Sequence, residues 1–399
     1  MANSNLTIDM ITNEALMILH QKANFLGTID TQYDKSFAKS GAKIGSALRV
    51  RLPNKYIVTD GATLGSQDST EEEVTLNVTT QKHVPINFTT AELTMDISDF
   101  SKRIIAPAVS ALVANVEASV MSSLYKQVYN YVPNIGSAAT FTKILEGAKN
   151  LTDSLAPYDE RCLSLNTQDN VDMVDALKGL FNAQDKLSSN YKEGRLAGPF
   201  AGFDDIYENT HWTRHTSGTA AATTGYLVNG ASQVGTSLTV DGGTTTFLEG
   251  DVITIAGVNG IHPETKADTG NLQKFVVRAA SGTSATSLTI SPSLNSAVNG
   301  QQNVTASPAD NAAIVKVNGG ASAVAGTSMA YHKDAFTFAT ADLVMPDGVD
   351  MAARKVLDGV SLRVVRNYDI NNDKMPCRMD ILFGSQALRP ELANRYGNN

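Results

Sequence analysis

The stretch Gly250-Asp251-Val252-Ile253-Thr254-Ile255-Ala256-Gly257-Val258 has the pattern of a β-strand and lies in a segment unlike the rest of the chain. Residues 217–330 hold 15 of the 30 Gly but only 10 of the 72 Asp, Glu, Lys and Arg residues. Short apolar runs in this segment alternate with Gly, Thr, Ser and Asn, which favour turns. A small barrel or sandwich is therefore expected here, inserted into a larger body. We expect its strands near 237–240, 252–256, 273–278, 287–290 and 313–317.

The segments on either side carry helical and strand patterns, which together predict an α+β body. The strongest helical pattern covers residues 97–131, where apolar residues recur at three- and four-residue steps. Pro107 lies inside this pattern and predicts a kink or a break. From Ala108 to Tyr129 the helix would be about 33 Å long, enough to span a domain.

The N-terminal part of the chain has elements that lack an internal partner. Residues 7–21 predict a short amphipathic helix, whose apolar stripe needs another surface to cover it. Residues 44–58 and 73–88 predict two strands, and the tip between them, 59–70, has almost nothing to bury. The helix is expected to pack on its own subunit or on a neighbour, and the two-stranded arm is expected to lie across another subunit. The predicted inter-subunit contacts are Ile8, Ile11, Leu64, Gln67, Glu71, Glu72 and Glu73, of which the three Glu also fit a solvated charge run.

The remaining body elements are shorter. Helices are expected at about 141–154, 167–181 and 184–190, and strands at 161–165, 201–207 and 378–383. Residues 331–343 and 360–371 look extended. The Gly/Ala/Ser stretch 318–328 predicts a linker.

Bulk properties limit the class of protein. A chain of 399 residues is long enough for two or three domains, and its net charge of −8 gives no global attraction to DNA or a membrane. Two cysteines, Cys162 and Cys377, are too few for a disulfide framework and predict reduced core thiols in a cytoplasmic protein. The start of the chain lacks the pattern of a signal peptide, and no run of about 18 consecutive apolar residues predicts a membrane span.

No group of residues predicts catalysis. His211 and His215 stand four apart, but they have no helical context and no third ligand nearby. Asp204 and Asp205 are neighbours on an expected strand, so their carboxylates point to opposite faces. The Gly-rich stretches lack the phosphate-binding pattern, and no nucleophile elbow is present. We expect no catalytic, cofactor or metal site, and no enzyme.

Several stretches around and within the insertion carry a resemblance to a known family. They are Ala201-Gly202-Phe203-Asp204-Asp205, Gly250–Val258, His332-Lys333-Asp334-Ala335-Phe336, Tyr368-Asp369-Ile370 and Ala387-Leu388-Arg389-Pro390-Glu391. Together with the order of elements, they resemble the P22-type coat proteins of tailed phages. These proteins have the Hong Kong 97-like major capsid fold with an inserted β-domain.

The resemblance implies a domain organisation. It comprises an N-terminal arm (1–35), an extended loop with adjoining strands (36–90), a spine helix with peripheral domain (91–140), an axial domain in two parts (141–216 and 331–399) and the inserted domain (217–330).

The resemblance also implies a function and partners. The chain would assemble as hexamers and pentamers into an icosahedral head in the host cytoplasm. Its partners would be its own copies, a scaffolding protein, a portal protein and a cement protein. It would enclose double-stranded DNA with only non-specific contact, and it would bind no membrane.

One alternative function remains open from the sequence. The inserted β-domain could recognise a glycan or a receptor on behalf of a phage or surface binding protein. Sugar sites depend on exposed aromatic rings, and the insertion has Tyr226 as its only Tyr, while the single Trp212 precedes it.

Overall fold

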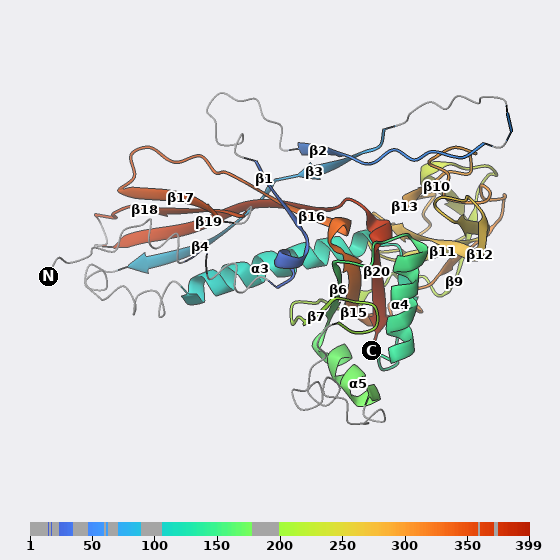
Figure 1. Cartoon of the computed structure of the whole chain (residues 1–399), viewed down its shortest axis with the longest axis horizontal. Helices are drawn as coiled ribbons and strands as arrows, with labels where there is room; N and C mark the ends of the chain where they lie inside the picture. The colour runs from blue at the N-terminus through green and yellow to red at the C-terminus, as the bar shows by residue number, and fades with distance from the viewer. Residues whose placement is uncertain are drawn as a thin grey trace. The chain divides into compact units, whose positions relative to one another are not determined.

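The computed structural model describes residues 15, 17, 24–34, 47–59, 61–62, 71–88, 106–177, 199–357, 360–370 and 374–399. The chain forms two compact units, each built from separate parts of the sequence (Figure 1). Unit 1 comprises Met1–Val50, Val74–Met121 and Phe336–Gln386, and unit 2 comprises Arg51–Glu73, Ser122–Ala335 and Ala387–Asn399. The predicted helices 7–21 and 184–190 and the loop tip from 63 to 70 lie almost entirely outside the described residues.

Unit 1 is built on a six-stranded sheet with the order β1-β16-β19-β18-β17, in which β4 also pairs with β19. The strands are β1 (Asp30–Asp34), β4 (Thr80–Phe88), β16 (Phe336–Ala341), β17 (Met351–Leu357), β18 (Val360–Arg366) and β19 (Met375–Ala387). Strands β4 and β19 pair antiparallel over nine residues, from Thr80↔Phe383 to Phe88↔Met375. Leu362 and Met379 are fully buried on one face of this sheet, as the two-residue period of a strand requires.

Helix α3 (Ala106–Leu124) gives unit 1 its long helix, and the 3₁₀-helix η5 (Tyr125–Gln127) follows it. Pro107 is the second residue of the described helix, and the residues before Ala106, where the expected kink or break would fall, lie outside the described residues. The predicted end at Tyr129 was wrong by five residues. The chain leaves the helix earlier because Tyr125 to Tyr131 turn into η5 and then into the short strand β5 (Tyr131–Pro133).

By length and composition alone, Ala106–Gln127 could cross a bilayer, with a mean hydropathy of 1.2. Half of this segment is buried inside the protein, including Val109 and Val120, and the buried Glu117 carboxylate accepts a hydrogen bond from the Phe25 N–H. A core helix has the same composition as a membrane span, so packing accounts for its apolar character.

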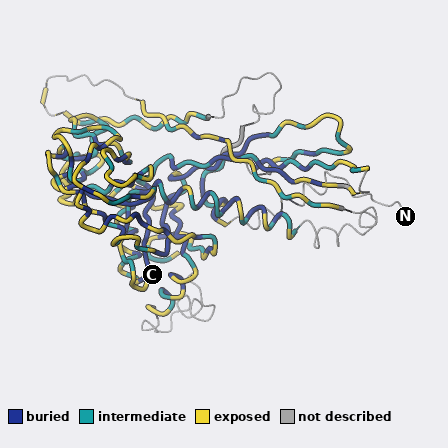
Figure 2. The backbone as a smooth tube through the Cα atoms, turned by 180° about the vertical axis from the view of Figure 1, so that it is seen from behind, coloured by how far each residue is buried: buried dark blue, intermediate teal, exposed yellow. Residues whose placement is uncertain are grey.

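Unit 2 contains a second sheet with the order β5-β20-β15-β6-β7, and β8 also pairs with β15. The other strands are β6 (Arg161–Leu165), β7 (Asp205–Glu208), β8 (His215–Thr216), β15 (Val324–His332) and β20 (Ala393–Asn398). Helices α4 (Phe141–Asp153) and α5 (Thr167–Leu177) accompany this sheet, and Thr140 caps α4. We call this sheet with its two helices the lobe. Strand β20 is buried along its whole length and β15 over all but its first residue, so they form the centre of the lobe (Figure 2).

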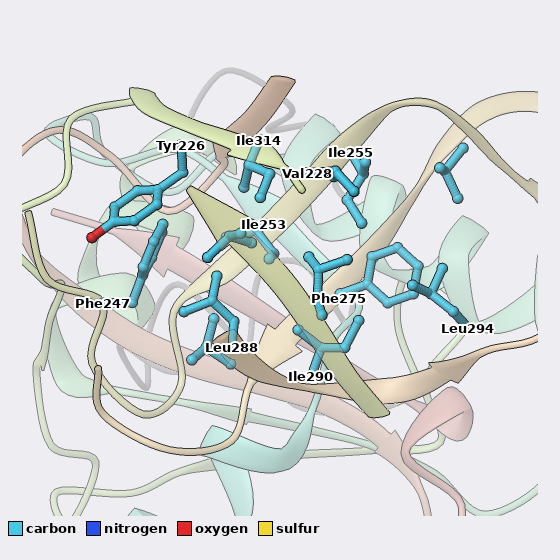
Figure 3. Close-up of a cluster of buried hydrophobic side chains, with 14 of the residues drawn as sticks. Tyr226, Val228, Phe247, Ile253, Ile255, Phe275, Leu288, Ile290, Leu294 and Ile314 are labelled. Carbon is cyan, nitrogen blue, oxygen red and sulfur yellow. The ribbon is translucent and has the colours of Figure 1, made fainter. Parts of the chain in front are cut away.

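The inserted segment forms a closed six-stranded barrel with the order β10-β13-β12-β11-β14-β9. Its strands are β9 (Thr223–Val228), β10 (Gly235–Asp241), β11 (Val252–Ile261), β12 (Asp268–Val277), β13 (Ser287–Leu294) and β14 (Ala313–Lys316). Alternate side chains of β9, β10 and β14 point inward. They join Phe247, Ile253, Phe275 and Ile290 in one apolar core (Figure 3). Closure leaves no open sheet edge in the barrel.

All five predicted barrel strands are present, but several body strands were missed. No strand was expected at β1, β5, β8, β17 or β20 of the body, nor at β9 of the barrel. The expected linker 318–328 becomes strand from Val324 onward, and the expected boundary at residue 330 falls within β15. The expected strand 201–207 begins only at Asp205, because the preceding residues form a turn closed by Phe200 and Phe203.

Removing a large side chain from the barrel core is expected to destabilise the barrel. Phe275→Ala should lower its free energy of unfolding by about 3–5 kcal/mol, because the buried ring leaves a cavity. Urea unfolding of the full chain, followed by hydrogen exchange of β12 and β13, measures this. Val234→Ala is the control, since Val234 is 64% exposed and its truncation should change stability by less than about 0.5 kcal/mol. Equal effects of the two substitutions would contradict the assigned core.

Candidate functional site: the neck between barrel and lobe

The barrel joins the lobe through a short neck, which we define as residues 213–218, 248–252 and 316–325 with the lobe side chains that contact them. The chain enters the barrel after β8 and leaves it into β15, and these two strands pair at Thr216↔Val324 and His215↔Ala325. The two ends of the insertion therefore lie side by side. An inserted domain needs this arrangement to leave the host sheet undisturbed.

Asp251 is the centre of the neck and is fully buried. One carboxylate oxygen accepts from the backbone N–H groups of Gly218 (2.9 Å) and Leu248 (2.8 Å). The other accepts from Asn318 Nδ2 (2.8 Å) and lies 3.2 Å from His215 Nε2. Burial acts to raise the pKa of Asp251, but these four hydrogen bonds outweigh it and hold the pKa below its usual value. Asp251 is therefore an anion that ties together the three segments of the neck, 213–218, 248–252 and 316–325.

His215 connects Asp251 to the lobe. Because a carboxylate only accepts, Nε2 of His215 carries the proton, and Nδ1 accepts from the Tyr125 hydroxyl at 3.3 Å. The two rings meet edge to face, with centroids 5.7 Å apart. Burial lowers the pKa of His215; the hydrogen bond to Asp251 opposes this, whereas the charges of Arg395 and Lys126 add to it. The neutral imidazole is thus the form that fits the neck.

Gly250 permits the close approach of these groups. Its φ of +95° is in the left-handed region, which favours glycine. A Cβ there would stand 3.1 Å from both His215 Cε1 and Lys126 Cγ. A larger residue at position 250 would therefore be strained in its backbone and would crowd His215 and Lys126.

Two buried cations complete the neck. Lys316 Nζ donates to Ser217 Oγ, Gly218 O and Gly320 O at 2.9–3.0 Å, and so clamps the start of the insertion to its end. Arg395, from β20, donates to Tyr125 O (3.3 Å) and Gly250 O (2.7 Å). Burial lowers the pKa of both groups, and the charge of Asp251 opposes that shift in each.

An apolar seam lies beside this polar network. Tyr131, Val252 and Val276 are buried together, with Tyr129 and Val317 packed against them. Lys274 Nζ donates to Tyr131 O at 2.9 Å across the same seam. Lobe and barrel are therefore joined by both apolar contact and hydrogen bonds.

The residues of the neck attach the barrel to the lobe. Within the described ranges no group of three or more His, Cys, Asp or Glu could hold a metal ion. His211 and His215 share no ligand, because His215 is engaged by Asp251 and Tyr125. Cys162 and Cys377 are buried free thiols, as expected, and burial raises their pKa to about 12 and about 11.

The predicted inter-subunit residues lie elsewhere. Ile8, Ile11, Leu64 and Gln67 fall outside the described residues. Glu71, Glu72 and Glu73 are exposed at the foot of the extended loop, where β2 (Ala47–Arg51) pairs with β3 (Glu73–Asn77). Glu71 forms an exposed ion pair with Arg51 at 3.1 Å. This part of the loop presents charge to solvent.

Sequence reasoning missed the neck. It examined His215 only as a metal ligand and did not single out Asp251, Lys316 or Arg395. The available signal was Asp251 itself, a charged residue directly before the fully buried run Val252–Ile255. Such a position requires partners, because an unpaired buried carboxylate is costly.

The alternative function, sugar recognition by the barrel, would need an exposed aromatic ring. The two rings considered for it, Tyr226 in the barrel and Trp212 before it, are both buried. Tyr226 is 1% exposed, and its ring packs on Phe247 with centroids 5.3 Å apart. Trp212 is 9% exposed and donates to Ser164 Oγ. Neither side chain offers a stacking surface to a sugar.

These observations define an α+β body that carries a closed β-barrel on a buried, charge-paired neck. The family profile described as P22 coat protein, gene protein 5, matches residues 60–395. The chain belongs to the P22 coat protein family. It is a coat protein of a phage capsid and is located in the virion, and the resemblance seen in the sequence is confirmed.

Solved structures similar to the chain include capsids. The capsid of cyanophage P-SCSP1u matches with a TM-score of 0.45 and 11% identity, covering 93% of this chain and 86% of that one. The mature capsid of bacteriophage PhiM1 matches with a TM-score of 0.46, 9% identity and the same coverages. The CUS-3 coat protein I-domain is 33% identical, with a TM-score of 0.19, and covers 23% of this chain and 94% of its own. No protein of curated function matches the sequence.

The titration of His215 makes a pH dependence of unit 2 testable. Its folded pKa lies below the value of about 6.5 of an unfolded histidine, so below that pH the unfolded chain binds more protons. The neutral His215 side chain therefore stabilises folded unit 2 fully above about pH 6.5, and this stabilisation is lost as the pH falls through the folded pKa. The free energy of unfolding falls by up to about 1.4 kcal/mol per pH unit over this range. Urea titrations followed by the fluorescence of Trp212, which lies in unit 2, measure it.

His215→Gln should flatten this slope, because the side chain no longer takes up a proton. His83→Gln should keep the wild-type slope, since His83 is exposed in unit 1. An unchanged slope in His215→Gln would show that another group causes the acid sensitivity.

Proposed function

We propose that many copies of this chain assemble as hexamers and pentamers into the icosahedral head that encloses the double-stranded DNA of a tailed phage. Membership in the P22 coat protein family over residues 60–395 is the observation that carries the proposal. An assembled shell draws its stability from many modest contacts repeated over every copy. We propose that the chain acts without enzymatic activity, as a structural coat protein of this family would.

The proposed domain organisation is the one that the resemblance to this family implies. We assign residues 1–35 to an arm, 36–90 to the extended loop and its strands, 91–140 to the spine helix and peripheral region, and 217–330 to the insertion. Residues 141–216 and 331–399 supply the axial domain. The neck described above then fixes the insertion to the axial domain of its own subunit.

The extended loop is the described region best suited to contact a neighbouring copy. Tyr56 and Val58 are 59% and 92% exposed, and apolar side chains with such exposure gain by being covered. Arg51 and Glu71 offer a charged pair beside them, with side chains 75% and 54% exposed. Ile8, Ile11, Leu64, Gln67, Glu72 and Glu73 remain the further predicted contacts.

Assembly involves other partners in this proposal. A scaffolding protein and a portal protein would guide shell formation in the host cytoplasm, and a cement protein could bind the outside. The net charge of −8 suits a lining that touches packaged DNA only non-specifically and does not grip it.

Electron microscopy of the chain produced with and without its scaffolding protein tests the proposal. The expected result is closed icosahedral shells, with six- and five-fold clusters of one protein, in the presence of scaffold. A chain that stays monomeric under both conditions, at concentrations where coat proteins assemble, would contradict it.

The tip of the extended loop gives a more specific prediction. Replacing Leu64–Thr70 with a short turn should leave the subunit folded, because the tip sequence has almost nothing apolar to bury. The same change should prevent assembly or yield unstable shells, because the neighbour loses its contact. Circular dichroism of the subunit and sedimentation of the assembly reaction measure the two effects. Loss of the folded spectrum would show that the tip supports its own subunit.

A further inference from the structure

The barrel carries an ordered surface loop at residues 295–303, directly after β13. Asn295 and Asn303 fasten its two ends to each other, since Asn303 N donates to Asn295 O (3.0 Å) and Asn295 N donates to Asn303 Oδ1 (3.0 Å). Asn299 closes the tip, accepting from Gln301 N and Gln302 N. The loop therefore has a fixed shape before anything binds to it.

A lysine from the turn between β11 and β12 fixes this loop to the rest of the barrel. Lys266 Nζ donates to Gly300 O at 2.9 Å and to Gln302 O at 3.1 Å. Val304, just beyond the loop, forms a bridge with Gly260 of β11. Loop 295–303 is thus a rigid part of the barrel surface.

The segment that leads into the extended loop lies directly on Gly300. A Cβ added to Gly300 would stand 1.9 Å from Lys55 O, 2.5 Å from Lys55 C and 3.1 Å from Tyr56 N. All three are backbone atoms, which cannot rotate away as a flexible side chain could. Real Cβ atoms essentially never come within 3.0 Å of another heavy atom, so any side chain at position 300 would force the two segments apart.

The contact with Lys55 and Tyr56, and not the backbone conformation, accounts for the glycine at position 300. The φ of Gly300 is outside the left-handed region, so any residue could adopt its backbone conformation. The three heavy atoms nearest its virtual Cβ all belong to the backbone of Lys55 and Tyr56. The side chains of residues 54 and 57 are half-buried while Lys55 and Tyr56 remain exposed, as expected for a segment resting on a surface by one side.

We propose that loop 295–303 is a seat for residues 53–57 of the same chain, so that the barrel supports the base of the extended loop and sets its direction. Lys55 also lies near the half-buried Lys266: burial lowers the pKa of Lys266, and the charge of Lys55 lowers it further. The contact leaves the Tyr56 and Val58 side chains exposed, so they stay available to another surface.

An intrachain cross-link between Lys55 and Lys266 reports the seated state. An equal mixture of unlabelled and ¹⁵N-labelled chains, kept unassembled and treated with an amine-reactive cross-linker, separates links within a chain from links between chains by mass spectrometry. The expected product joins Lys55 and Lys266 of one chain. A link found only between labelled and unlabelled chains would overturn the proposal, because the seat would then hold a neighbour's loop.

Gly300→Ala and Gly300→Val test the contact itself. We expect the ratio of seated to released loop to fall about tenfold or more, and the rate of the intrachain link to fall with it. The melting temperature of the barrel should not change. Gly282→Ala and Gly282→Val are the controls, because Gly282 is also on the barrel, has no positive φ and has nothing within 4 Å of its virtual Cβ.

Two outcomes of the Gly300 series would contradict the seat. One is an unchanged rate of cross-linking in both variants, and the other is loss of the barrel fold in Gly300→Ala, which would assign the glycine to the barrel's own structure. Because the cross-link is measured on unassembled chains, its result does not depend on shell formation. Shells that fail to form while the link is present would refute the proposed function and leave the seat intact.

Discussion

The buried carboxylate of Asp251 is the constraint on which unit 2 depends. A carboxylate removed from water is tolerated only if its oxygens are fully paired, and here four donors from the three segments of the neck converge on it. Two of them, Gly218 and Asn318, belong to the two ends of the insertion. Breaking such a site by removing the carboxylate costs about 3–5 kcal/mol, comparable to a large core truncation. An arrangement of barrel and lobe that left the Asp251 carboxylate unpaired would be costly in free energy. The barrel is therefore attached in the one arrangement that pairs it.

The neck also explains how a body sheet can carry an inserted domain of this size. Strands β8 and β15 pair directly, so the chain departs and returns at neighbouring positions of the lobe sheet. Lys316 and Arg395 add positive charge on either side of Asp251, which balances the buried anion. For a coat protein this means that the barrel's position on its own lobe is set by short-range contacts within one subunit.

The sequence predicted those helices and strands whose hydrophobic pattern is visible within a few consecutive residues. Strand β6 and helix α4 were predicted almost to the residue, since continuous burial and a three-to-four-residue period are visible in sequence. Strand β9 was missed because Thr223-Thr224-Gly225 has turn-like composition, although Tyr226 and Val228 enter the barrel core. Strand β15 was taken in part for a linker, because a central strand between β20 and β6 is built here from small residues such as Ala325 and Ser328. Composition alone does not separate such a strand from a flexible segment.

The neck could not be predicted, because its members come from distant parts of the sequence. Asp251 meets His215 across 36 residues and Asn318 across 67, and Arg395 reaches Gly250 across 145. Only the sheet topology brings these groups together. The same holds for Gly300 and Lys55, whose contact depends on where the barrel surface lies in unit 2.

Hydrogen exchange of the full chain carrying Asp251→Ala, compared with Asp241→Asn at the exposed end of β10, tests the central role of this carboxylate most directly. The account predicts that the amides of Gly218 and Leu248 lose protection in Asp251→Ala, together with the β8–β15 pairing. The amides of β12 and β13 inside the barrel should keep most of theirs. Protection at Gly218 and Leu248 equal to that of the wild-type chain would contradict the account.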